Sequence, residues 1–124
     1  MTITEADLAD LVRKWQPVLG LSDWRVKVSL KRAADLKNGS AEGENATVLA
    51  RKLAHISIAN PDELSVDLSF APDPEHTIVH ELLHCHFAPF MSEKHGSLKH
   101  IAQEQAIDLI ANALVALDRR ATAP

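Results

Sequence analysis

The sequence has 124 residues and a mass of 13.6 kDa, which fits one compact domain because domains commonly comprise about 100–150 residues. Hydrophobic residues make up 46% of the chain and charged residues 24%, an ordinary balance for a globular protein. The formal net charge of −4 argues against a nucleic-acid partner, since such binding needs concentrated positive charge. We therefore predict a single domain over residues 1–124 that binds no nucleic acid.

The sequence also argues against a membrane or secreted protein. Its apolar runs are only a few residues long, far below the ~20 that a membrane-spanning helix requires. The acids Glu5, Asp7 and Asp10 lie where a secretory signal needs a basic start and an apolar stretch. The one cysteine, Cys85, cannot form an intramolecular disulfide, which agrees with a reducing compartment. We expect a cytoplasmic protein without a membrane partner.

The first predicted element is an amphipathic helix. Thr4, with Asp7 three residues later, is typical of a helix N-cap, and Pro17 and Gly20 interrupt the pattern that follows. Apolar residues recur at helical spacing between these signals: Leu8, Leu11, Val12 and Trp15. We predict a helix from about Glu5 to Gln16.

The middle of the chain is predicted to form short strands. Apolar and polar residues alternate strictly from Trp24 to Lys31, which predicts a strand that covers a core on one face. Residues 35–45 contain Asn-Gly, a second glycine and charges, as a solvated loop does. Further strands are predicted at 46–50 and 53–59, joined by a turn at 51–52, and residues 65–70 form either a fourth strand or an extended loop.

Two helices are predicted in the second half. The run Asp73-Pro74-Glu75 supplies an N-cap carboxylate, a proline at the first helical position and an acid in the first turn. That helix should end at about Ala88, before Pro89. A last helix, from about Ser97 to Arg119, carries apolar residues on one side: Leu98, Ile101, Leu109, Ala113 and Leu117. The order of elements predicts an α+β fold in which helices pack on one face of a small mixed sheet of three or four strands.

The helix predicted from Asp73 contains the motif H-E-x-x-H as His80-Glu81-Leu82-Leu83-His84. Positions i and i+4 of an α-helix lie one turn apart on the same face, so both imidazoles can reach one metal ion. Glu81 then lies beside the ion, where it can take a proton from water. The alternative is an amphipathic helix without a metal site, whose polar face matches the motif by chance.

A third ligand is available on the last predicted helix. Glu104 lies twenty positions after His84, and Asp108 follows it on the same helical face. A carboxylate there completes a His2Glu set with one position left for water, and a second acid one turn along can accept the proton on the far nitrogen of a ligand imidazole.

The pattern H-E-L-L-H, then nineteen residues, then E-Q-A-I-D resembles the gluzincin zinc peptidases, the thermolysin-like class, whose signature is H-E-x-x-H followed by E-x-x-x-D. It is also similar to the small ImmA/IrrE-type metallopeptidases of phages and mobile elements, in which E-x-x-A-[ND] precedes an Ala- and Leu-rich helix. Ala106 stands one place early for that second pattern. The resemblance covers about residues 74–117.

The resemblance implies a zincin-like fold and a hydrolase that binds one Zn²⁺ and cleaves peptide bonds in a protein or peptide. By position, the zinc ligands are His80, His84 and Glu104, the general base is Glu81, and Asp108 supports a ligand, most simply His80. Zincins bind their substrate extended along an edge strand ahead of the active-site helix. The best match for that edge strand in this chain is residues 53–59.

The chain departs from the thermolysin-like pattern in the groups that stabilise the oxyanion. Those enzymes use a tyrosine and a histidine, whereas this sequence has no tyrosine. His95 and His100 are the candidate replacements, the latter one turn before Glu104. Loss of an oxyanion donor costs about 10²–10³ in rate.

Two other functions stay open for the same residues. One is a non-catalytic or weakly active zinc-binding regulatory module, which would have no need of a base at Glu81. The other is an amidase or a related hydrolase, since H-E-x-x-H does not specify the acyl group.

We expect His76, beside the helix N-cap, to be solvated rather than a ligand, and Cys85 to be a small buried apolar residue.

Overall fold

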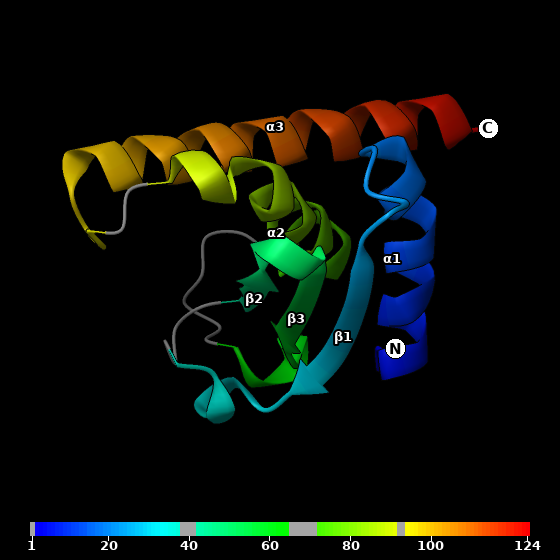
Figure 1. Ribbon diagram of the computed structural model, residues 1–124. Coiled ribbons are helices and arrows are strands. Elements are labelled where there is room, and N and C mark those ends of the chain that lie inside the picture. Colours follow the sequence, from blue (N-terminus) through cyan, green and yellow to red (C-terminus); the bar gives the residue numbers. More distant parts are fainter. Residues whose placement is uncertain (1, 38–41, 65–71, 92–93) are drawn as a thin grey trace.

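The computed structural model describes residues 2–37, 42–64, 72–91 and 94–124. Within these residues the chain forms three α-helices and one three-stranded sheet (Figure 1). The elements are α1 Glu5–Val18, β1 Arg25–Lys31, β2 Gly43–Val48, β3 Leu53–Ala59, α2 Pro74–Phe87 and α3 Leu98–Thr122. The predicted α+β fold is confirmed. The predicted strand or loop at 65–70 lies outside the described residues.

The sheet is mixed, with the strand order β1-β3-β2. Strand β3 pairs in parallel with β1 and in antiparallel with β2. The prediction that residues 53–59 form the edge strand for substrate is therefore wrong, because both sides of β3 are already paired. Its β-branched residues Ile56 and Ile58 are fully buried, as suits a central strand. The edge strand that packs beside α2 is β2.

Strand β2 begins earlier than its composition suggests. Gly43, Glu44 and Asn45 were predicted to lie in a loop, but they pair with β3. The strand also ends earlier, at Val48, and a single 3₁₀ turn over Leu49–Arg51 leads into β3. The hydrogen-bonded ladder with β3 overrides the weak strand propensity of Gly-Glu-Asn.

Helix α1 begins as predicted and ends two residues later. Thr4 and Asp7 form a reciprocal capping box, in which each backbone N–H donates to the other side chain. Pro17 lies inside the last turn, where a missing N–H costs little because the helix is already ending. Gly20, with φ of 72°, then reverses the chain direction in a conformation that glycine adopts without strain.

Helix α2, which carries H-E-x-x-H, has the predicted bounds. The Asp73 side chain accepts a hydrogen bond from the backbone N–H of His76, and Pro74 occupies the first helical position. After Phe87 the chain continues as a 3₁₀ turn over Ala88–Phe90, which contains Pro89. These local signals fix where the helix begins and thus which residues face α3.

The core lies between the sheet and the helices, with α1 and α2 on one face of the sheet and α3 across α2 (Figure 1). Helix α3 faces this core with Ile107, Ala111 and Val115. The apolar side predicted for this helix is instead exposed, and its large residues are Leu98, Ile101, Leu109 and Leu117. The face that contacts α2 is the one that also bears the acids Glu104 and Asp108, so hydrophobicity alone selected the wrong side.

Candidate metal centre

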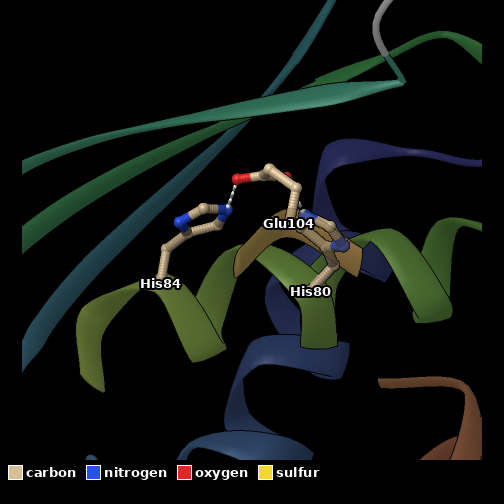
Figure 2. Close-up of side chains that lie close together, drawn as sticks. All are labelled: His80, His84 and Glu104. Carbon is tan, nitrogen blue, oxygen red and sulfur yellow. Dashed lines mark hydrogen bonds and ion pairs between the residues drawn. The ribbon is translucent and has the colours of Figure 1, made fainter. Parts of the chain in front are cut away.

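The antiparallel packing of α2 and α3 places the predicted ligands together. His80 and His84 lie one helical turn apart on α2, with ring centroids separated by 5.2 Å. Glu104 of α3 reaches across to both of them, as Figure 2 shows. Its Oε1 lies 3.0 Å from His84 Nε2 and its Oε2 lies 3.2 Å from His80 Nε2. Residues 24 and 20 positions apart in the sequence thus share one site.

These three side chains could hold a metal ion. One ligand atom from each can be chosen so that all lie within 4.8 Å of one another. All three side chains are partly buried, between 16% and 34% exposed, so the site is reachable from solvent. Two imidazoles with one carboxylate are a donor set that transition metals favour.

The electrostatics of the cluster match a cation-binding role. Hydrogen bonds with His80 and then with His84 hold the pKa of Glu104 well below its ordinary value of 4.5. Burial is the largest influence on the pKa of His80 and lowers it, but the hydrogen bond with Glu104 and the nearby carboxylate charges together outweigh burial and leave the pKa raised. Glu104 is thus ionised, as a metal ligand must be, whereas His80 would have to give up a proton in order to bind a metal ion.

Asp108 lies behind His80. Its Oδ1 accepts from His80 Nδ1 at 3.3 Å, so Nδ1 carries the proton and Nε2 faces the ligand cluster. This is the position predicted for Asp108. The same Oδ1 lies 3.4 Å from His76 Nε2. His76 is not solvated as expected, since its side chain is only 17% exposed and contacts the site.

Glu81 is among the buried charged residues, at 7% exposure. It lines two cavities, of about 220 Å³ and 770 Å³, that meet at the ligand cluster. Burial raises the pKa of Glu81, and the nearby histidines only partly oppose this effect. A carboxylate with a raised pKa that faces a cavity is suited to take and return a proton.

The larger cavity is bounded by the edge strand β2, through residues 43–47, and by the ligand helices. Asn45 Nδ2 donates to the backbone oxygen of Glu81 at 2.7 Å, which ties this strand to α2. Gly43 allows the same close approach, because a Cβ there would lie 2.7 Å from Thr77 Cγ2. Sequence reasoning missed both residues, and their only signal was an Asn and a Gly next to the predicted second strand.

His95 and His100, the candidate oxyanion stabilisers, also line the larger cavity together with Glu104. Their rings contact each other at a centroid distance of 4.6 Å, and His100 Nδ1 accepts from the backbone N–H of Gly96.

Cys85 is buried at 3% exposure, as predicted for a small apolar residue. Burial raises the pKa of its thiol, so it does not offer a thiolate to the site.

Comparison with known proteins gives no relative for this chain. No family model, no curated protein and no solved structure matches it. Among the described residues, no helix combines the length and apolar character needed to cross a membrane.

Proposed function

We propose that this protein is a zinc-dependent metallopeptidase of gluzincin type. The observation that carries the proposal is the convergence of His80 and His84 with Glu104, beside the cavity-facing carboxylate of Glu81. With Zn–N and Zn–O bonds of ~2.0–2.2 Å in tetrahedral geometry, ligand atoms lie about 3.3 Å apart. In this structure each imidazole nitrogen lies 3.0 or 3.2 Å from a different oxygen of Glu104, and one ligand atom from each residue lies within 4.8 Å of the other two. This closeness and the His2Glu donor set support zinc as the ion.

Zinc, when bound, supplies the Lewis acidity that lowers the pKa of water to ~7 and polarises a carbonyl. The protein residues then act in sequence. Glu81 takes a proton from the attacking water and returns it to the leaving amine as the C–N bond breaks. Asp108 accepts from His80 Nδ1 and would hold the ring with Nε2 toward a bound ion, once Nε2 has given up the proton that it shares with Glu104 in the metal-free protein.

A peptide substrate fits beside β2. This strand pairs with β3 on one side, and no described strand pairs with its other side. A peptide in extended conformation can add to such an edge through backbone hydrogen bonds. Residues 43–47 line the cavity that also contains Glu81 and His84, so a peptide placed there has its carbonyl near the ligand cluster.

The test is cleavage of an unfolded protein mixture by the zinc-loaded wild type beside Glu81→Gln. The amide keeps the size of the side chain but removes the base, so we expect zinc content to be unchanged and the cleavage rate to fall by about 10²–10⁴. Mass spectrometry of the products gives the cut sites. Equal cleavage by both proteins would contradict the role of Glu81.

The absence of tyrosine favours one alternative, a zinc-binding regulatory module. Zinc bound in both proteins, with no cleavage of peptides by either, would support that module over the peptidase. Release of ammonia from simple amides without peptide cleavage would support an amidase. Lack of zinc in the purified wild type would overturn the metal site itself.

A further inference from the structure

Five side chains of α2 and α3 form one continuous series of contacts, which we name the histidine–acid chain. Its members alternate between the two helices in the order His84, Glu104, His80, Asp108, His76. The four successive N···O distances are 3.0, 3.2, 3.3 and 3.4 Å. The regular spacing of four residues on each helix produces this series, because it places all three histidines on one face of α2 and both acids on one face of α3.

The proposed peptidase function uses the first four members and leaves His76 without a role. His76 Nε2 is fully buried, and no hydrogen bond to it is formed within the described part of the chain. Its ring also contacts that of His80 edge-on, with centroids 6.3 Å apart. Its backbone N–H is bound by Asp73 at the helix N-cap, so the start of α2 fixes where the ring lies.

The carboxylate of Asp108 needs such a neighbour. Its side chain is 50% exposed, and an exposed carboxylate held by one contact rotates among several rotamers at little cost. His80 Nδ1 and His76 Nε2 lie 3.3 and 3.4 Å from that Oδ1, so the oxygen is placed between the two rings. The orientation in which Asp108 supports His80 is then favoured over the others.

We propose that His76 is a positioning residue for the metal centre, which acts by holding Asp108 against the ligand His80. The proposal rests on the zinc site proposed above. Outer partners of ligand histidines are worth about 10–100-fold in metal affinity. His76 lies one contact further out, and its loss should weaken zinc binding by about threefold to tenfold, at or below the low end of that range.

The experiment measures the zinc dissociation constant by competition with a chromophoric chelator. The proteins are wild type, His76→Phe, Asp108→Ala and the double variant. Phenylalanine keeps the ring volume and removes both nitrogens. We expect weaker binding by about threefold to tenfold for His76→Phe and about 10–100-fold for Asp108→Ala. In the double variant His76→Phe should add nothing, because its effect passes through Asp108.

Two controls separate positioning from general damage. His86→Phe makes the same change on the same helix, where the ring contacts the backbone oxygen of Leu19 instead of the site, and it should leave zinc affinity unchanged. His76→Gln retains an N–H donor and should restore most of the affinity lost with phenylalanine. Thermal unfolding of the metal-free proteins shows whether each variant is folded, and His76→Ala, which also lacks both ring nitrogens, replaces the phenylalanine variant if that one does not fold.

Three results would overturn the inference. Wild-type affinity in His76→Phe would remove His76 from the metal centre while leaving the peptidase proposal intact. An equal loss in the presence and absence of Asp108 would show that His76 acts by another route. Wild type that binds no zinc would end both this inference and the proposed function, and so differs from the first two results.

Discussion

At the scale of single residues, Glu104 joins the two helices of the candidate metal centre. Each of its carboxylate oxygens contacts a different imidazole, and these contacts keep its pKa low. Asp108 and His76 follow from the same spacing along the helices. Glu104 is therefore the one acid of the cluster whose removal should affect the metal directly rather than through another side chain.

We predict that Glu104→Gln weakens zinc binding by more than the ~100-fold that outer partners reach. An amide oxygen carries no charge and is a poor zinc ligand. Chelator competition gives the dissociation constant, and Glu63→Gln, which changes an acid in a distant 3₁₀ turn, is the matched control. Unchanged affinity in Glu104→Gln would exclude it as a ligand.

The residues found from sequence are those with a fixed local spacing. H-E-x-x-H and the acid pair four residues apart each lie on one helix, so their relative geometry follows from helical periodicity. Asn45 was missed because its contact with Glu81 joins a strand to a helix 36 positions away. His76 was missed because its burial depends on how closely α3 packs beside α2, which local signals do not specify.

At the scale of elements, α3 does not pack its most hydrophobic side against the core. The helix has a strongly apolar side, with Leu98 at 86% and Leu109 at 67% exposure. The side that faces the core bears Ile107 and Ala111, flanked by the acids of the metal centre. The buried residues and the acids thus share the side that faces α2, and the more hydrophobic side is left outward.

This arrangement predicts opposite outcomes for two similar substitutions in α3. Ile107→Ala removes a fully buried side chain and should lower the free energy of unfolding by about 2–5 kcal/mol. Leu109→Ala, two residues away and exposed, should change it by no more than about 0.5 kcal/mol. Urea unfolding of both metal-free proteins makes the comparison. A larger loss for Leu109→Ala than for Ile107→Ala would reverse the assignment of the two faces.

The strands also show how far local sequence patterns predict the fold. Alternation identified β1, β-branched residues identified β3, and the start of α2 was clear from its cap. The order of the strands could not be predicted in this way, since it depends on pairing between residues far apart in sequence. Residues 53–59 were expected to be the edge strand only because the zincin resemblance places such a strand ahead of the helix with H-E-x-x-H, and the burial of Ile56 and Ile58 could not be read from their spacing.

At the scale of the whole molecule, one ion-pair network joins all three helices. Asp73 and Glu75, at the start of α2, both bind Arg119 near the end of α3. Glu75 also accepts from Lys14 and from Trp15 Nε1 of α1, at 2.7 Å each. Because α2 and α3 run antiparallel, this network fixes their alignment, and the histidines meet the acids further along the same pair of helices.

The network predicts how stability depends on pH. Burial raises the pKa of Glu75, but the hydrogen bonds from Lys14, Trp15 and Arg119 and the charge of Lys14 together outweigh burial and leave the pKa lowered from its ordinary 4.5. A carboxyl group whose pKa is lowered by folding stabilises the folded state above the unfolded value, and this contribution is lost as the pH falls through the folded value. Wild type should therefore lose stability from about pH 4.5 downwards, faster than Glu75→Gln does.

Near neutral pH, Glu75→Gln should cost about 1.5–3 kcal/mol, as expected for hydrogen bonds to a charged group. Urea unfolding at pH 7 and pH 4, in the presence of a chelator, measures both effects while keeping the metal centre empty in every protein. Asp10→Asn removes an acid of an exposed ion pair with Arg13 and should change stability little at either pH. If the difference in the free energy of unfolding between wild type and Glu75→Gln stayed constant from pH 7 to pH 4, the carboxylate charge of Glu75 would not hold the three helices together. The alignment of α2 with α3 would then rest on the apolar core alone.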